Sequence, residues 1–374
     1  MSREAAFKYS AYPLTGKERE LTVYYALPDN MDDQTGMLLL LSGFGGSPEA
    51  NVYKKMRTLF ADQYNLVVVC PFYMGLEFMG DWLKLDIEEA ELRKLYTALP
   101  IPIRNQVFNK GMCDLKKLID LNLPNEIRLK VSALLEETDD NFVDMGPVQA
   151  VDCMRALKAV YDTVSGDGSP VNIGRILAYG HSHGAYLAHL CNRFFPNVFL
   201  SILDNSAWIR PAYLTGPRNL HESINNVILE ESFNYRIASQ KYDEELYDLR
   251  FLYKGFKNNA NLIIYQGVTD FLIDHHAKAA IFESVEHVTF NMITEQEVDG
   301  LAIRSTAHGD ADFLELFHKV AREHAELFSV QQKANIFDSV ETINTDIATY
   351  RFDFIEGRPN MTRSKRSRKN GKRH

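Results

Sequence analysis

Cysteine is scarce in this chain, and long apolar runs are missing from it. The 374 residues include 4 cysteines, and no two of them form a Cys-x-x-Cys pair. The sequence therefore offers neither a disulfide framework nor a zinc site. No apolar run approaches the roughly 18 residues that a membrane-spanning helix needs, and the first residues lack the apolar core of a signal peptide. We expect a protein of the reducing cytoplasm.

Acidic residues outnumber basic ones in the chain as a whole, and basic residues are concentrated at the C-terminus. The chain has 50 Asp and Glu against 41 Lys and Arg, a net charge of −9. Seven of the basic residues lie in the last twelve positions, which contain no acid, so the remainder carries 34 basic and 50 acidic residues, or −16. Such an acidic body argues against a nucleic-acid enzyme. The basic tail is expected to be disordered, with weak attraction to an anionic surface as the alternative.

Short apolar runs alternate with helical patterns through most of the chain. The run 36–41 is apolar on both faces and predicts an inner strand of a parallel sheet, and 65–70 predicts a second inner strand. Further strands are predicted at 175–179, 198–203, 262–265 and 288–293. A stripe of apolar residues spaced three or four apart predicts a long helix over 147–164. This alternation of strands and helices predicts an α/β fold with a mostly parallel, doubly wound sheet.

Two stretches interrupt the alternation and are interpreted as helical insertions that form a cap. They lie at about 71–145 and 207–258, where polar, aromatic and proline-containing segments replace the apolar runs. With these insertions included, one domain is predicted for residues 1–329. Residues 330–357 are left as a C-terminal appendage, and residues 358–374 as the disordered basic tail.

A Gly-x-Ser-x-Gly motif lies between a predicted strand and a predicted helix. It reads Gly180-His-Ser-His-Gly184, after the run 175–179 and before an apolar helical segment. A serine at a tight strand-to-helix turn has a strained backbone, and its neighbours two positions away must lack side chains. The following helix directs its first N–H groups and its positive dipole end to the place where negative charge would develop. The motif predicts that Ser182 is a nucleophile.

A serine hydroxyl needs a base to take its proton and an acid to orient that base. In the chain order typical of this kind of turn, the serine is followed by Asp or Glu and then by His, each after a strand. Asp270 follows the next-to-last predicted strand, and His308 lies in the loop after the last one. We expect Ser182, Asp270 and His308 to form a triad. Asp204, which ends the preceding strand, is the alternative acid.

The glycine-rich turn after the run 36–41 is a candidate for binding an oxyanion. Two backbone N–H groups are needed to hold the developing charge. His183, directly after the serine, is expected to supply one of them, and Phe44, or alternatively Gly45, the other. The turn is no phosphate loop, because no Gly-Lys-Ser/Thr follows it. The predicted chemistry uses no metal and no cofactor.

Together these motifs resemble those of the serine α/β-hydrolase superfamily. A narrower resemblance, over about residues 35–320, is to a bacterial family of α/β-hydrolases of unknown function, carried by Leu41-Ser-Gly-Phe-Gly-Gly46, Val69-Cys-Pro-Phe-Tyr73 and Ala307-His-Gly309. Members of that family tend to occur among genes for surface glycans and flagellin glycosylation. This chain departs from the family pattern in the strand-to-helix turn that carries Ser182, the nucleophile elbow, where the bulky His181 and His183 flank the serine.

The ordered set of Ser182, Asp270 and His308 predicts a serine hydrolase that acts on an ester, of the carboxylesterase or deacetylase kind. Its expected substrate is a small-molecule or glycan ester, such as an O-acylated carbohydrate or a similar metabolite. An acyltransferase or a peptidase that uses the same three residues is one alternative. A non-catalytic interaction protein built on a hydrolase scaffold is another.

Overall fold

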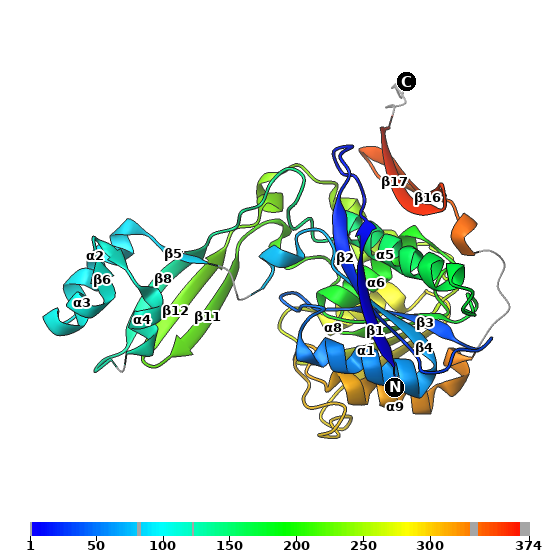
Figure 1. Ribbon diagram of the computed structural model, residues 1–374, viewed down its shortest axis with the longest axis horizontal. Coiled ribbons are helices and arrows are strands. Elements are labelled where there is room, and N and C mark those ends of the chain that lie inside the picture. The colour runs from blue at the N-terminus through cyan, green and yellow to red at the C-terminus, as the bar shows by residue number, and fades with distance from the viewer. Residues whose placement is uncertain (1, 81–83, 122, 330–335, 367–374) are drawn as a thin grey trace. The chain divides into compact units, whose positions relative to one another are not determined.

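A computed structural model describes residues 2–80, 84–121, 123–329 and 336–366 (Figure 1). The chain forms two compact units. The main unit comprises residues 1–79, 144–211 and 242–374, and the inserted unit comprises residues 80–143 and 212–241. Each unit has its own sheet and its own apolar core.

The main unit is built on an eight-stranded sheet. Its strand order is β1-β2-β4-β3-β9-β10-β13-β14. β1 pairs antiparallel with β2, and β2 pairs antiparallel with β4, while the strands from β4 to β14 pair parallel to one another. The bounds are β1 Arg3–Ser10, β2 Glu20–Leu27, β3 Gly36–Leu41, β4 Leu66–Pro71, β9 Ile176–His181, β10 Ser201–Asn205, β13 Asn261–Gly267 and β14 Val288–Ile293. The predicted mostly parallel sheet is confirmed.

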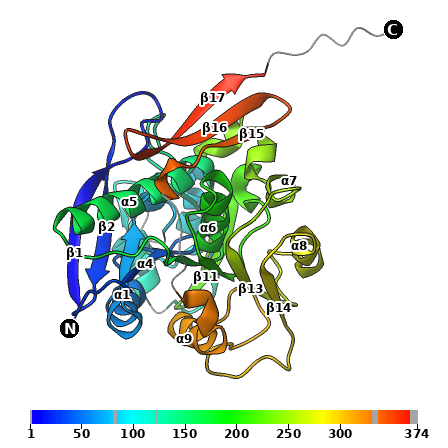
Figure 2. The same ribbon diagram turned by 90° about the vertical axis from the view of Figure 1, so that its right-hand side faces the viewer.

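Helices cover both faces of this sheet, as the predicted doubly wound arrangement requires (Figure 2). Every residue of β3 and β4 is buried, because each of these strands packs on both sides. Helices α1 (Asn51–Tyr64) and α9 (Phe313–Glu323) lie on one face, where Phe60 and Phe317 stack with ring centroids 4.2 Å apart. Helices α5 (Pro147–Gly166) and α6 (His183–Phe194) cover the opposite face, and α8 (His275–Phe282) lies beside β14.

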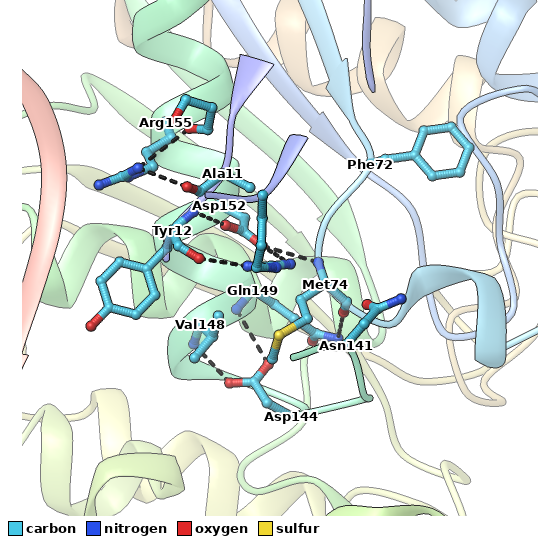
Figure 3. Close-up of polar contacts among 12 residues, drawn as sticks. Ala11, Tyr12, Phe72, Met74, Asn141, Asp144, Val148, Gln149, Asp152 and Arg155 are labelled. Atoms are coloured by element: carbon cyan, nitrogen blue, oxygen red, sulfur yellow. Dashed lines mark hydrogen bonds and ion pairs between the residues drawn. The ribbon is translucent and has the colours of Figure 1, made fainter. Parts of the chain in front are cut away.

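Two charged side chains of α5 connect this helix to the N-terminal part of the chain (Figure 3). Asp152 is fully buried and accepts hydrogen bonds from the backbone N–H groups of Tyr12, at 2.7 Å, and Met74, at 3.1 Å. Arg155 donates to the carbonyl oxygen of Ala11 at 2.8 Å and to that of Pro359 at 2.7 Å. A single helix therefore binds segments from both ends of the chain.

The C-terminal part of the chain forms a three-stranded antiparallel sheet. Its strands are β15 (Glu341–Asn344), β16 (Ala348–Ile355) and β17 (Arg358–Lys365). Phe352 of β16 stacks on Phe194 of α6, with ring centroids 4.1 Å apart and an angle of 5° between the ring planes. The prediction of a disordered tail from residue 358 is therefore wrong for residues 358–365, because β17 pairs with β16 along its whole length. Residues 367–374 of the predicted tail lie outside the described residues.

The inserted unit contains a second sheet, of strand order β11-β12-β8-β5. The bounds are β5 Leu85–Ile87, β8 Ile127–Ala133, β11 Arg218–Ile224 and β12 Val227–Phe233, with helices α2 Glu89–Ala98, α3 Ile101–Val107 and α4 Leu115–Asp120. The insertions, which were predicted to be helical, therefore contain a four-stranded sheet in addition to three helices. Alternate residues of β12 are buried, which is the pattern of a strand with one face on a core. The residues from 242 to 258, predicted to belong to the second insertion, lie in the main unit.

The remaining elements are short. They are β6 Phe108–Asn109, β7 Met112–Cys113 and α7 Leu249–Leu252, with single 3₁₀ turns at Leu76–Phe78, Ala212–Leu214, Arg236–Ser239, Glu244–Tyr247, Ala325–Phe328 and Ile336–Asp338. Within the described part of the chain, no helix combines the length and the apolar character needed to cross a membrane.

Candidate active site

Ser182 lies in the tight turn between β9 and α6. Its backbone angles are φ 51° and ψ −122°, a conformation that residues other than glycine rarely adopt. A Cβ added at Gly180 would lie 2.4 Å from the backbone N of Ala185, and one at Gly184 would lie 2.4 Å from the carbonyl oxygen of Leu41. Both glycines of the motif are therefore required by close packing of the backbone, and Ser182 is held at the N-terminus of α6.

The loops after β13 and β14 bring Asp270 and His308 to this serine. His308 Nε2 lies 2.8 Å from Ser182 Oγ, and His308 Nδ1 lies 2.7 Å from Asp270 Oδ2. Because a carboxylate only accepts hydrogen bonds, Nδ1 carries the hydrogen and the lone pair of Nε2 faces the serine hydroxyl. The structure thus places the three predicted residues in the order Ser, His, Asp.

Asp270 is held as a carboxylate. Its side chain is buried, and burial alone would raise its pKa, but the hydrogen bonds from His308 and Gln266 outweigh this effect and lower the pKa. The other carboxylate oxygen, Oδ1, accepts the backbone N–H groups of Leu272 at 2.8 Å and Ile273 at 3.0 Å. Both oxygens are therefore fixed in position.

Asp204, the alternative acid, has a different set of partners. It lies at the end of β10, fully buried, and contacts His189 Nε2 at 2.9 Å and Lys278 Nζ at 3.0 Å. Burial would raise the pKa of Asp204, but the charge of Lys278 and the hydrogen bond from His189 lower it to about 2. The structure brings Asp270, rather than Asp204, to the imidazole of His308.

The glycine turn after β3 packs against the elbow. A Cβ added at Gly43 would lie 2.7 Å from His181 Nε2, and Gly45 has a positive φ of 81°. The ring of Phe44 lies 5.6 Å from the ring of His183 in an edge-on arrangement. His183 is the first residue of α6, so its N–H has no carbonyl partner one turn earlier in the helix. Of the predicted oxyanion-binding residues, His183 directly follows Ser182, Phe44 contacts His183, and Gly45 lies in the same turn as Phe44.

The two histidines that flank Ser182 are held by other partners. His183 Nε2 lies 2.8 Å from Gln149 Oε1. The ring of His181 stacks on the ring of Phe313, with centroids 3.9 Å apart. Burial lowers the pKa of each imidazole to about 3. Both rings are therefore neutral near neutral pH, and His308 is the histidine within hydrogen-bonding distance of the serine.

An open groove of about 690 Å³ lies on one side of His308. The N-terminal turn of α1 and the loop before α9 form its walls, with Val52 and Leu314 as apolar contacts and Lys55 and Arg304 as cations. Arg304 is paired with Asp312 at 2.7 Å. The groove offers space for a substrate beside the imidazole.

Two buried polar residues behind Asp270 escaped the sequence analysis. Gln266 Nε2 donates to Asp270 Oδ2 at 2.8 Å, and Lys278 Nζ donates to Gln266 Oε1 at 3.1 Å. The one available signal was the helical spacing in α8, which places Lys278 on the same face as Phe282, four residues later. Among the described residues, no group of three or more His, Cys, Asp or Glu side chains is arranged to hold a metal ion.

Comparison with family models assigns the chain to a known family. A family model described as "Protein of unknown function (DUF2920)" matches residues 15–357. The chain belongs to this family. A search of curated proteins finds no match.

Solved structures resemble this member of the family at low sequence identity. An S-formylglutathione hydrolase from Agrobacterium tumefaciens is 15% identical, with 88% of this chain and 96% of that chain covered and a TM-score of 0.47. Est1E from Butyrivibrio proteoclasticus, bound to ferulic acid, is 12% identical, with 83% and 95% covered and a TM-score of 0.44. The esterase Est22 is 12% identical, with 88% and 79% covered and a TM-score of 0.50.

The likeness to Est22 concerns the fold alone. Together with the strand order and the parallel pairing of the main sheet, it shows that the chain has the α/β-hydrolase fold. The predicted fold class is confirmed at this level.

Proposed function

We propose that this protein is a serine hydrolase that cleaves carboxylic esters. The observation that carries the proposal is the position of His308, which lies within hydrogen-bonding distance of both Ser182 and Asp270. A serine hydroxyl becomes an effective nucleophile when a positioned imidazole takes its proton and a carboxylate holds that imidazole in one tautomer.

In the proposed reaction, Ser182 Oγ attacks the carbonyl carbon of the ester while His308 Nε2 takes the hydroxyl proton. The resulting oxyanion accepts hydrogen bonds from the backbone N–H groups of His183 and of Phe44 or Gly45. As the ester bond breaks, the leaving alkoxide takes the proton from His308 and departs as an alcohol. Water then attacks the acyl-enzyme while His308 takes its proton. The bond between the acyl carbon and Ser182 Oγ breaks, Ser182 receives the proton from His308, and the carboxylic acid leaves.

The substrate class that we propose is an O-acylated carbohydrate or a similar small metabolite. The groove beside His308 combines apolar walls with the cations Lys55 and Arg304, which suits a substrate with both apolar and polar parts. The resemblance to a family that occurs among surface-glycan genes also favours an acylated sugar. Acyl transfer to a second alcohol would use the same acyl-enzyme, with the acceptor hydroxyl in place of water.

The test is labelling with a fluorophosphonate probe, which reacts with an activated serine. Wild type should be labelled, and Ser182→Ala and His308→Ala should lose at least ~10³-fold in labelling rate. Ser165→Ala, in the last turn of α5, is the matched control and should label like wild type. Equal labelling of wild type and Ser182→Ala would overturn the proposal.

A panel of aryl esters of increasing chain length, followed by acetylated sugars, then assigns the substrate. Product analysis with and without a sugar acceptor separates hydrolysis from acyl transfer. Turnover of peptides with no turnover of esters would replace the esterase assignment with a peptidase.

A further inference from the structure

Behind the proposed triad lies a continuous series of buried hydrogen bonds. It runs from Asp270 through Gln266 and Lys278 to Asp204, and then to His189. The last four of these side chains are each 0% exposed. They come from β13, α8, β10 and α6, so the series crosses the main unit from one element to the next.

Lys278 determines which way the amide of Gln266 points. A lysine ammonium group only donates hydrogen bonds, so the oxygen Oε1 of Gln266 must face Lys278 Nζ, at 3.1 Å. The amide nitrogen Nε2 is then directed to Asp270 Oδ2, at 2.8 Å. If the amide were reversed, its oxygen would face the carboxylate of Asp270, and two acceptors would repel each other.

The oxygen of Asp270 that receives this hydrogen bond is the one that holds His308. Oδ2 accepts both His308 Nδ1–H, at 2.7 Å, and Gln266 Nε2–H, at 2.8 Å. A carboxylate oxygen with two donors at fixed directions has little freedom to rotate away from the imidazole. The orientation of Gln266 therefore bears directly on the position of His308.

Lys278 and Asp204 are a buried pair of opposite charges. Desolvation makes a buried lysine costly, and a buried ion pair is often no more stabilising than apolar side chains of similar size. Stability alone is therefore a weak reason for a lysine at this position. The negative charge of Asp204, 3.0 Å from Nζ, balances the ammonium and limits its field at the triad.

We propose that Gln266 and Lys278 are positioning residues for the triad. Lys278 fixes the amide of Gln266, the amide fixes the carboxylate of Asp270, and Asp204 balances the charge of Lys278. This inference rests on the proposed hydrolase function, because its consequence is the geometry of His308 against Ser182.

The network predicts charge-dependent shifts in the pH profile. Removing the positive charge of Lys278 makes Asp270 a better partner for a protonated His308, so the acidic limb of kcat/KM moves to higher pH. Removing the negative charge of Asp204 leaves Lys278 unbalanced, and the acidic limb moves to lower pH. The other titratable or charged groups near His308 are unchanged in both variants: His181, Lys55, Arg304, Asp310 and Asp312.

The experiment compares Gln266→Leu, Lys278→Met, Asp204→Asn and the double variant Lys278→Met/Asp204→Asn with wild type. The pH dependence of kcat/KM is measured on an aryl ester, and thermal unfolding is followed in parallel. Gln266→Leu should lose between about ten- and hundredfold in kcat with KM nearly unchanged. Lys278→Met and Asp204→Asn should shift the acidic limb by about half a pH unit in opposite directions. The double variant should return the limb towards wild type while kcat stays low.

A readout that needs no turnover keeps the test independent of the stability of a single variant. The proton between His308 Nδ1 and Asp270 gives a low-field NMR signal, and His308→Ala identifies it by its loss. In Gln266→Leu this signal should move or broaden. The inference would be overturned if Gln266→Leu had the kinetics, the acidic limb and the proton signal of wild type. It would also be overturned if the acidic limb moved in the same direction in Lys278→Met and Asp204→Asn.

Failure of this inference differs from failure of the proposed function. If Ser182 is labelled by the fluorophosphonate in wild type but Gln266→Leu behaves as wild type, the positioning role alone is wrong. If wild type and Ser182→Ala are labelled equally, the hydrolase proposal itself is wrong.

Discussion

The backbone of Gly267 touches that of Thr306. A Cβ added at Gly267 would lie 2.1 Å from the carbonyl oxygen of Thr306, so only glycine fits at this point. The same carbonyl accepts the N–H of Thr269 at 3.1 Å, and the hydroxyls of Thr269 and Thr306 lie 2.7 Å apart. Asp270 directly follows Thr269, and His308 comes two residues after Thr306. This contact therefore sets the spacing of the two loops that carry the acid and the base.

Replacing Gly267 with alanine should separate these loops. The added methyl group must displace the backbone of Thr306, because no flexible side chain is available to yield. We expect Gly267→Ala to lower kcat at least ~10-fold through misplacement of His308, and to lower the free energy of unfolding by about 1–3 kcal/mol. Ester-hydrolysis kinetics and urea unfolding measure the two effects.

Gly166→Ala is the matched control for this substitution. Gly166 ends α5, and a Cβ added there meets nothing within 4 Å. It should leave both kcat and stability close to wild type. Unchanged kcat in a folded Gly267→Ala variant would show that the contact between the loops does not position the base.

Asp270→Asn should abolish most activity while keeping the shape of the side chain. Asparagine can present an N–H to His308 Nδ1 and stabilise the tautomer whose Nε2 carries a hydrogen and can no longer accept the serine proton. We expect kcat to fall about 10⁴-fold. Asp310→Asn is the control, since Asp310 is an exposed acid two residues from His308, bonded to Ser305 at 2.6 Å. Similar losses in the two variants would contradict the assignment of Asp270 as the acid.

The sequence predicted the main sheet better than the inserted one, for a physical reason. Strands such as β3 and β4 are buried on both faces, so they are continuous apolar runs that stand out from their surroundings. In β12 and β8 one face is buried, and charged residues such as Glu230 and Lys130 alternate with the apolar ones. Strand β17 is mostly polar, and its extended form follows from pairing with β16, which local composition does not reveal.

The proximity of Ser182, Asp270 and His308 was predictable because each residue follows a strand, in a chain order typical of this fold. Ser182 was further marked by Gly180 and Gly184, whose absent side chains are a property of the sequence itself. Gln266 and Lys278 carry no such mark. Their positions depend on which side chains meet across β13 and α8 in the folded protein, and polar residues at such positions are more commonly solvated than buried.

Arg155→Lys tests the connection between α5 and the two ends of the chain. The guanidinium donates to the carbonyls of Ala11 and Pro359 from different nitrogens, and a lysine cannot reproduce this fork. Buried carbonyls without donors cost free energy, so the free energy of unfolding should fall by about 2 kcal/mol. Activity of the folded variant should stay near that of wild type.

The control is Arg250→Lys, which changes an exposed arginine paired with Asp248 at 2.6 Å. Exposed pairs contribute at most about 1 kcal/mol, so urea unfolding should detect little change. Equal stability of the Arg155 and Arg250 variants would show that the buried fork does not secure the C-terminal sheet.

The stability of the protein should depend on pH through His183. Burial lowers the pKa of this imidazole in the folded protein to about 3, whereas in the unfolded chain a histidine titrates near 6.5. Above about pH 6.5 the ring is neutral in both states and its contribution to stability is fully present. As the pH falls from about 6.5 towards 3, the unfolded chain binds a proton that the folded protein does not, and this contribution is lost by about 1.4 kcal/mol per pH unit.

His183→Gln should remove this dependence while keeping a donor for Gln149 Oε1 and the backbone N–H beside Ser182. Urea unfolding between about pH 4 and 6 should give a slope of free energy against pH that is about 1.4 kcal/mol per pH unit smaller than in wild type. His276→Gln, which changes an exposed histidine of α8, is the matched control. Identical slopes in wild type and His183→Gln would mean that the ring of His183 is as readily protonated in the folded protein as in the unfolded chain.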